Sequence, residues 1–276
     1  MLLIDGPYLA HRSYHAPFKL TTSDGLNATM IHSFLKTLKS LDNKFQPTNT
    51  ILTWESHNTR SWRKDMYPDY KMSRKAKKIP KSFFPLLDDL QLFLHLLGFK
   101  QYYSPHNEAD DVIAHFIYEK EPDKKAIIFT VDKDIMQLVD RKCFVWNGKQ
   151  LFDRDAVIEK YNVPPELIPD YLAIQGDVSD NILGIKNYGG RKAARILKKH
   201  GCIEDIPKED TINCYDNIMK RNKKLTTLNH ACSILPLSFK NNGCSLDSLL
   251  DKYELKKIKE EISDYKKLAS VRKKWF

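Results

Sequence analysis

Acidic side chains stand at the ends of three short apolar runs that predict buried strands. Asp5, Glu55 and Asp132 each come directly after such a run. In open α/β sheets, the carboxyl ends of the strands border the functional crevice. A single acid there is equally consistent with a helix N-cap or a turn, but three together favour one acidic edge. The three runs are Leu2–Ile4, Thr50–Trp54 and Ala126–Val131.

Further carboxylates occur in tight groups. Glu-Ala-Asp-Asp opens a predicted helix, and the i,i+3 spacing of Glu108 and Asp111 places both on one face. Acids at a helix start also complement the macrodipole, although that effect needs one or two acids rather than three. The other groups lie in predicted turns or at helix boundaries. The grouped acids are Glu108, Asp110, Asp111, Asp132, Asp134, Asp177 and Asp180.

Carboxylates gathered this closely repel one another, so some take up protons unless a cation is present. A ligand set of oxygens without Cys or His suits Mg²⁺ or Mn²⁺ rather than zinc. The chain has no H-E-x-x-H and no C-x-x-C, and its 5 scattered cysteines indicate reduced thiols. Two divalent ions about 4 Å apart can clamp a phosphodiester, activate water and stabilise the leaving oxygen. The acids therefore indicate a nuclease.

The charge balance of the whole chain indicates a polyanionic partner. Among 276 residues, Lys and Arg number 45 and Asp and Glu 35, so the formal net charge is +10. Nucleic acid is the first expectation and an anionic membrane surface the second, and the apolar runs are too short to span a bilayer. Aromatic residues at 11% exclude a wholly disordered chain. The start Met1–Asp5 does not have the pattern of a signal peptide.

A segment that mixes cations with aromatic rings, residues 60–85, follows soon after Glu55 and is placed to overhang the acidic edge. Cations that follow phosphates and rings that stack on bases suit single-stranded nucleic acid. A solvated basic loop is the alternative.

A Gly-rich turn at 184–190 leads into a predicted basic helix. Its backbone N–H groups can bind phosphate, although such loops are often only connections. Beyond it, Asp251–Phe276 has a Lys-rich helical pattern that predicts a mainly solvated helix.

Helical patterns alternate with the predicted strands, and weaker strand candidates lie at Tyr102–Tyr103 and Phe144–Trp146. This alternation predicts an α/β domain with a largely parallel sheet. The predicted helices are Ala28–Leu41, Phe84–Leu97 and Ala109–Tyr118.

Taken in their order along the chain, several motifs of this sequence resemble those of the 5′ nuclease or flap endonuclease family. That family includes the 5′-nuclease domain of bacterial DNA polymerase I and stand-alone phage 5′–3′ exonucleases. The resemblance covers most of residues 2–200; one motif alone is a weak match, but five in register are highly specific. The motifs are Leu3-Ile4-Asp5-Gly6, Arg60 or Arg63 followed by Tyr70-Lys71-Met72-Ser73-Arg74, Glu-Ala-Asp-Asp at 108–111, Thr-x-Asp-Lys-Asp at 130–134 and Gly-Asp-x-Ser-Asp-Asn at 176–181.

The resemblance implies a fold. Residues 1–175 would form a PIN-like α/β nuclease core that includes a helical arch at about 60–85. Residues 176–276 would form a helix-hairpin-helix DNA-binding region followed by C-terminal helices.

The resemblance also implies two-metal hydrolysis of DNA, with two Mg²⁺ or Mn²⁺ ions in the site. The first metal group would be Asp5, Glu55, Glu108, Asp110 and Asp111, and the second Asp132, Asp134, Asp177 and Asp180. Catalysis would involve Lys71, Arg74 and Asp132, with the two cations contacting the scissile phosphate and Tyr70 stacking on the terminal base. The implied DNA-binding residues are Arg60, Arg63, Tyr70, Lys71, Arg74, Gly184, Lys186, Gly189, Gly190, Arg191 and Lys192, with a K⁺ ion at the hairpin.

The chain departs from the family pattern at two places. Glu55 stands where the family usually has Asp, and its longer side chain can still reach a metal or act through water. The hairpin of the family usually reads Pro-Gly-Val-x-Gly-Ile-Gly, whereas residues 183–189 read Leu-Gly-Ile-Lys-Asn-Tyr-Gly. Asn187 tolerates a left-handed backbone better than most residues other than Gly.

The leading hypothesis is a stand-alone, monomeric, Mg²⁺-dependent 5′ nuclease in the cytoplasm of a bacterial or phage-infected cell. Its substrate would be DNA with a 5′ flap, a 5′ end or a single-strand/duplex junction, and no polymerase domain follows. One alternative is a protein that binds branched DNA but cuts it poorly because of Glu55. Another is a PIN-type ribonuclease.

Overall fold

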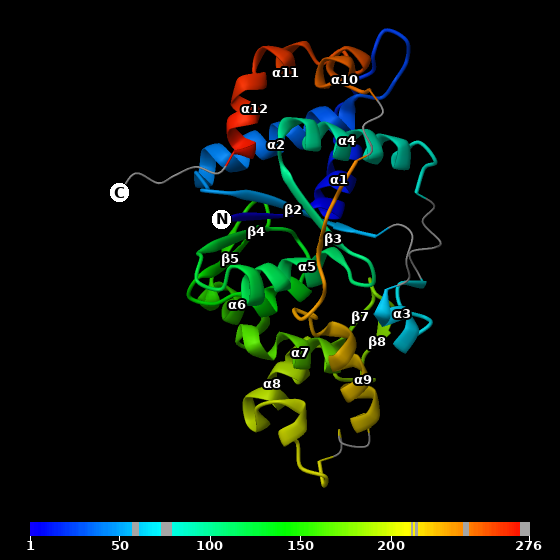
Figure 1. Ribbon diagram of the computed structural model, residues 1–276. Helices are drawn as coiled ribbons and strands as arrows, with labels where there is room; N and C mark the ends of the chain where they lie inside the picture. The colour runs from blue at the N-terminus through cyan, green and yellow to red at the C-terminus, as the bar shows by residue number, and fades with distance from the viewer. Residues whose placement is uncertain (57–60, 73–78, 211, 213–214, 240–242, 271–276) are drawn as a thin grey trace.

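The centre of the molecule is a mostly parallel sheet, seen in the computed structural model in Figure 1. The structure describes residues 1–56, 61–72, 79–210, 212, 215–239 and 243–270. Within these residues the sheet is 7-stranded. Its strands are β1 Leu2–Asp5, β2 Thr50–Glu55, β3 Lys100–Ser104, β4 Ala126–Phe129, β5 Cys143–Trp146, β6 Leu151–Phe152 and β9 Leu235–Pro236.

The strand order is β6-β5-β4-β1-β2-β3-β9, and all neighbours pair in parallel except at the edges β6 and β9. β1 is buried along its whole length, and β2 is buried up to Trp54. Helices on both faces of a parallel sheet cause this two-sided burial, which explains the continuous apolar runs in the sequence. All five predicted strands are confirmed, although the run at 126–131 leaves the sheet after Phe129.

Helices cover the sheet on both faces (Figure 1). One face carries an apolar core shared with α1, α2 and α4, and the other a core shared with α5, α7 and α8. The three predicted helices are confirmed, but the third changes to a π-helical turn at Phe116–Lys120. The helices are α1 Gly6–Tyr14, α2 Thr29–Phe45, α3 Trp62–Met66, α4 Phe83–Leu97, α5 Ala109–His115, α6 Arg154–Tyr161, α7 Ile168–Gln175, α8 Gly190–His200, α9 Asp216–Thr226, α10 Leu246–Lys252, α11 Lys256–Glu260 and α12 Ile262–Ala269.

The C-terminal helices correct one expectation. The pattern after Asp251 predicted a single solvated helix grouped with the DNA-binding region. Instead α10, α11 and α12 are separate helices whose buried residues, such as Leu250, Ile258 and Tyr265, join the core of α2 and α4 (Figure 1). Their Lys residues remain at the surface, while an apolar stripe on the inner side supplies the packing.

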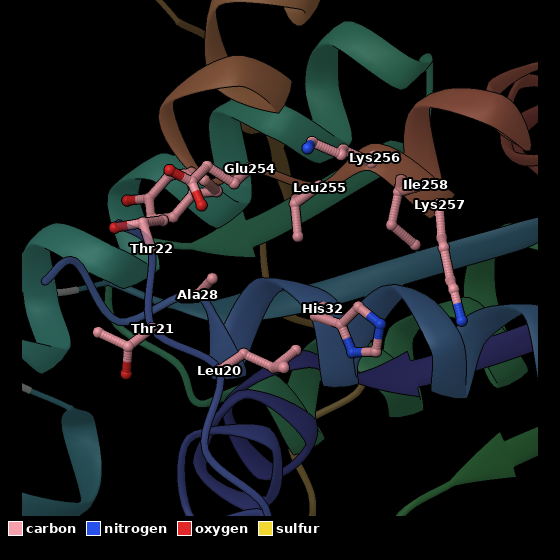
Figure 2. Close-up of a pocket in the computed structure, with 11 residues that line it drawn as sticks. Leu20, Thr21, Thr22, Ala28, His32, Glu254, Leu255, Lys256, Lys257 and Ile258 are labelled. Carbon is pink, nitrogen blue, oxygen red and sulfur yellow. The ribbon is translucent and has the colours of Figure 1, made fainter. Parts of the chain in front are cut away.

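A small cavity of about 210 Å³ marks the seam between these C-terminal helices and α2 (Figure 2). His32 of α2 and Lys257 of α11 line one end of it, and Thr21 and Thr22 line another part. Burial, together with the charges of Lys36 and Lys257, lowers the pKa of His32. The acids singled out from the sequence do not line this cavity.

A second, smaller unit contains α7, a short antiparallel hairpin, α8 and α9. The hairpin consists of β7 Gly176–Asp177 and β8 Ile182–Leu183. It carries the turn with Asp177 and Asp180, which lies close to Asp134 in the segment after β4. Among the described residues, no helix is both long enough and apolar enough to cross a membrane.

Candidate active site

The carboxyl ends of β1, β2 and β4 bring their acids to one edge of the sheet. β1 pairs with β2 on one side and with β4 on the other, both in parallel. Asp5 ends β1 and caps α1, because its Oδ1 accepts a hydrogen bond from the Tyr8 N–H at 3.0 Å. Its Oδ2 accepts another from the Thr130 hydroxyl at 2.7 Å, which joins it to the loop after β4. Glu55 is exposed at the end of β2.

Helix α5 adds a second group of acids. Glu108 is its N-cap, and a capping box links Glu108 with Asp111. Asp110 lies in the first turn and is half-buried. The Glu-Ala-Asp-Asp motif is therefore a helix start, as the sequence predicted, and the capping bonds fix its orientation.

The β7–β8 hairpin supplies a third group. Asp177 Oδ1 accepts hydrogen bonds from both the N–H and the hydroxyl of Ser179, which shapes the turn. Lys133 Nζ lies 2.9 Å from the same oxygen. One carboxylate oxygen from each of Asp134, Asp177 and Asp180 lies within 4.8 Å of the others, and all three residues are buried. The structure thus brings together three acids of the predicted second metal group.

Burial and mutual repulsion raise the pKa values of several of these acids. Burial, reinforced by the charges of Asp132 and Glu55, raises the pKa of Asp5 to about 7 despite two hydrogen bonds that oppose it. Burial and the charges of Asp132 and Asp5 raise the pKa of Asp110 well above its ordinary value. The pKa of Asp134 is likewise raised by burial and by Asp132, Asp180 and Asp177. The acids therefore form one electrostatically coupled cluster.

The raised pKa of Asp5 predicts that its contribution to the stability of the metal-free protein falls as the pH rises from about 4 to about 7. A carboxyl whose pKa is raised on folding stabilises the protein below its unfolded pKa, and this contribution is lost as the pH passes the folded pKa. For Asp5, a rise of about three pKa units corresponds to about 4 kcal/mol.

The measurement is the free energy of unfolding in chelator for the wild type and for Asp5→Asn. We expect the two to converge near pH 4 and Asp5→Asn to be the more stable near pH 7. Added Mg²⁺ should stabilise the wild type at pH 7, because bound cations replace the missing protons. Equal pH dependence in the two proteins would contradict the raised pKa of Asp5.

The donor set fits a hard divalent cation. All donors are carboxylate oxygens, which Mg²⁺ and Mn²⁺ prefer. Asp134 Oδ1 is buried and accepts no hydrogen bond from any described residue. A buried acceptor without a partner costs free energy unless a proton or cation satisfies it.

Tyr70 and Lys71, which belong to the predicted arch segment, contact the acidic cluster. Lys71 Nζ lies 2.6 Å from Glu108 Oε1 and 3.9 Å from Asp180 Oδ2. The Tyr70 hydroxyl lies 2.9 Å from Glu108 Oε2 and 2.7 Å from Asp180 Oδ2, within donating distance of both. Burial opposes ionisation of Glu108, but Lys71 and Arg63 outweigh it and lower its pKa to about 2.

The placement of Tyr70 corrects one prediction. A ring that stacks on a terminal base has to be accessible, but Tyr70 is only 2% exposed and its hydroxyl is directed at the acids. Its ring is enclosed by the hairpin and α9, next to Ile182 and Leu225. Tyr70 therefore packs under the site and does not form a stacking platform. Arg60 and Arg74 lie outside the described residues.

Arg63 and Asp111 also differ from their predicted roles. The Arg63 side chain is 2% exposed and forms a bidentate pair with Asp111, at 2.6 and 2.8 Å. Asp111 is fully buried, and its two oxygens also accept hydrogen bonds from the N–H groups of Glu108 and Asn229. The prediction of Asp111 as a metal ligand and Arg63 as a DNA contact is therefore wrong, because each saturates the other.

The residues of the predicted DNA-binding hairpin fall into two kinds: cations that are exposed and glycines that pack against α7. Lys186 in the turn before α8 and Arg191 and Lys192 in the first turn of α8 are exposed. Asn187 has the left-handed backbone (φ 69°) that the sequence allowed. Gly189 is also exposed.

Gly184 and Gly190 instead allow close packing. A Cβ on Gly184 would overlap the Gln175 carbonyl, and a Cβ on Gly190 would overlap the Tyr171 hydroxyl. These two glycines allow the hairpin and α8 to pack closely against α7. A DNA contact through their backbone N–H groups stays a prediction.

Gly184→Ala should destabilise the protein by about 1–3 kcal/mol, the usual cost of overpacking against atoms that cannot move away. The Cβ would meet backbone atoms of Gln175 and Gly176, so the hairpin itself would have to shift. Gly189→Ala is the matched control, because no described atom lies within 4 Å of a Cβ there. Chemical denaturation measures both; equal stability of the two variants would contradict the packing role.

Some residues at the site were not singled out from the sequence. Thr130 holds Asp5, and Lys133 neutralises Asp177. Both lie in the Thr-x-Asp-Lys-Asp motif, so the motif itself pointed to these residues. The sequence did not show that they contact Asp5 and Asp177. Ser179 likewise lies within its motif and shapes the acidic turn.

Comparisons with known proteins agree with this architecture. A family model described as "5′-3′ exonuclease, N-terminal resolvase-like domain" matches residues 1–162, and one described as "5′-3′ exonuclease, C-terminal SAM fold" matches residues 163–248. A 5′-3′ exonuclease of Aquifex aeolicus is 37% identical over 213 residues, which are 75% of this chain and 72% of that protein. A 5′-3′ exonuclease of Buchnera aphidicola is 29% identical over 98% of this chain and 90% of its own.

Among solved structures, the complex of the bacteriophage T5 D15 flap endonuclease with DNA and metal ions has a TM-score of 0.69. It covers 97% of this chain and 98% of its own at 19% sequence identity, so it establishes the likeness of fold.

Proposed function

The chain belongs to the 5′-3′ exonuclease family, and from this premise we propose that it is a Mg²⁺-dependent, structure-selective nuclease that cuts DNA near a 5′ end. The preferred substrate is a 5′ flap or a single-strand/duplex junction, and the protein acts as a monomer. The observation that carries the proposal is the buried triad of Asp134, Asp177 and Asp180, whose oxygens lie within 4.8 Å of one another.

Two groups of carboxylates would hold two cations. Asp132, Asp134, Asp177 and Asp180 form one proposed group; Asp5, Glu108 and Asp110 form the other. The charge of Glu55 acts on Asp5, and we propose that Glu55 holds the second cation directly or through water. Bound divalent ions supply charge neutralisation, an activated water and stabilisation of the leaving oxygen.

The remaining residues of the site bind and orient the substrate. Lys71 is 13% exposed beside the acidic cluster. There it can give up its ion pair with Glu108 and contact a phosphate oxygen of the substrate instead. A positioned cation stabilises the charge that develops during phosphoryl transfer. Lys186, Arg191 and Lys192 provide exposed charge for duplex phosphates on the neighbouring unit. The K⁺ ion at the hairpin and the cytoplasmic location stay predictions.

The test is cleavage of an end-labelled DNA duplex that carries a 5′ flap. We expect short 5′ products with Mg²⁺, no product with chelator, and slower cutting of a blunt duplex of the same sequence. Tight binding without Mg²⁺-dependent product would favour the branched-DNA-binding alternative. Faster cutting of the matching RNA flap would favour the ribonuclease. Sedimentation of the free protein checks the monomer.

A further inference from the structure

Arg63 uses all of its hydrogen-bond donors inside the protein. A guanidinium carries five N–H groups and accepts nothing. In Arg63, Nε donates to the Leu225 carbonyl at 2.8 Å, and Nη1 donates to Asp111 at 2.6 Å and to Glu108 at 3.4 Å. Nη2 donates to Asp111 at 2.8 Å and to the Thr227 carbonyl at 3.2 Å. No donor is left over for a substrate phosphate.

The five bonds join three parts of the chain that are distant in sequence. Arg63 itself lies on α3, at the base of the predicted arch. Asp111 and Glu108 belong to the start of α5, and the Leu225 and Thr227 carbonyls belong to the end of α9 and the residue after it. The Asn229 N–H donates to Asp111 Oδ1 at 2.8 Å, which strengthens the link between α5 and the segment after α9.

The connection ends at a proposed metal ligand. Asp111 Oδ2 accepts a hydrogen bond from the Glu108 N–H at 3.1 Å, while Arg63 contacts the Glu108 side chain directly. The Arg63–Asp111 pair therefore holds both the backbone and the carboxylate of Glu108. Because Asp110 lies between the two anchored residues in the sequence, its place in the turn is set as well.

We propose that Arg63 is a positioning residue, which orients Glu108 toward the metal centre by anchoring the first turn of α5 to α3 and to the end of α9. The proposal rests on the metal-dependent nuclease activity proposed above. Residues that orient metal ligands commonly change metal affinity or activity by about 10–100-fold when they are replaced.

Stability alone does not explain the arrangement. Buried ion pairs can often be replaced by uncharged residues of similar size without loss of stability, so they are weak evidence for a stabilising role. The geometry also requires arginine, because a lysine has its three donors on a single nitrogen and cannot form the planar fork. Trp62, whose ring lies 4.6 Å from the guanidinium, packs against it.

Two variants test the proposal. Arg63→Met with Asp111→Asn removes both charges, so that neither is left buried without its partner. Arg63→Lys keeps the charge and removes the fork. The matched control is Arg154→Met with Glu166→Gln, because Arg154 and Glu166 form the same bidentate pair at 2.7 and 2.8 Å on an exposed surface.

The readouts are Mn²⁺ affinity by electron paramagnetic resonance, kcat on the flap substrate, and DNA affinity in chelator at several salt concentrations. Both Arg63 variants should bind Mn²⁺ about 10–100-fold more weakly and lose kcat to a similar degree. Their DNA affinity and its salt dependence should remain those of the wild type, and the control should match the wild type throughout. Circular dichroism checks that each variant is folded.

Two results would overturn the role of Arg63. Wild-type Mn²⁺ affinity and kcat in the folded double variant would reduce the pair to a structural contact. Weaker DNA binding with a salt slope lower by about one would instead identify a phosphate contact. If the double variant does not fold, the same measurements on Arg63→Lys decide whether Arg63 is a positioning residue. Failure of the wild type to bind Mn²⁺ or to cut DNA would refute the proposed function itself, which separates the two outcomes.

Discussion

Asp134→Asn should reduce DNA cleavage by on the order of 10³-fold or more, since it removes a charged ligand from the proposed metal centre. Asp134 Oδ1 is a buried oxygen that lacks a described partner, and Asp134 belongs to the triad with Asp177 and Asp180. Asn has the same shape, so the fold should be kept. DNA binding in chelator should be unchanged or stronger, because Asn brings no negative charge close to the phosphates.

The same variant has a signature that does not depend on catalysis. In chelator, Asp134→Asn should be more stable than the wild type at neutral pH, because burial and neighbouring acids make ionisation of Asp134 unfavourable. Added Mg²⁺ should stabilise it less than it stabilises the wild type. Asp123→Asn is the control, since that side chain is 96% exposed. Full cleavage by Asp134→Asn would refute its place in the metal centre.

Lys71→Met should lower kcat by about 10²–10³-fold, the usual effect of removing a group that stabilises developing charge. Its affinity for plain duplex should change little, because Lys71 is 13% exposed and faces the acids rather than the outer surface. Met retains most of the length and apolar character of the side chain. Single-turnover cleavage and duplex binding, measured on the same preparation, separate the two effects.

Lys71→Met should also raise the pKa of Glu108, because Lys71 is the largest of the influences that lower it against the effect of burial. The pH profile of metal binding should shift upward accordingly. Lys267→Met serves as the control, since Lys267 is 74% exposed on α12. Equal losses of kcat and duplex affinity in Lys71→Met would mean that Lys71 is only a general phosphate contact.

The sequence predicted much of the acidic site because its acids follow strands or sit in turns. An acid at the carboxyl end of a parallel strand has little choice of direction, so Asp5 and Glu55 reach the same edge whatever surrounds them. The turn with Asp177 and Asp180 was likewise visible as a motif. Its partner Asp134 joined it as expected, because the loop after β4 is short.

The roles of Arg63, Tyr70 and Asp111 were not predictable in this way. Each has a residue type that suits DNA or metal, and each stands in a motif beside residues for which those roles are proposed. Successive helical residues point about 100° apart, so Asp110 and Asp111 face different surroundings even though they are adjacent. What Asp111 faces is Arg63 and the segment after α9, which are 48 and 118 residues away in the chain.

For the C-terminal helices, too, the sequence predicted the local structure but not the tertiary contacts. Their Lys-rich pattern predicted helix, which is a local property of 3.6-residue periodicity. Whether their apolar stripe covers α2 and α4 or the DNA-binding unit depends on the path of the chain through β9, which no local pattern records.

By itself, the sequence determined the fold class and the chemistry of the acids, because these depend on strand ends, periodicity and residue type, and its motifs showed the resemblance to the family. Only the tertiary structure decided which charges remain available and which neutralise each other. Such pairing depends on contacts between distant segments, where a few ångströms separate a proposed metal ligand such as Glu108 from a buried anchor such as Asp111.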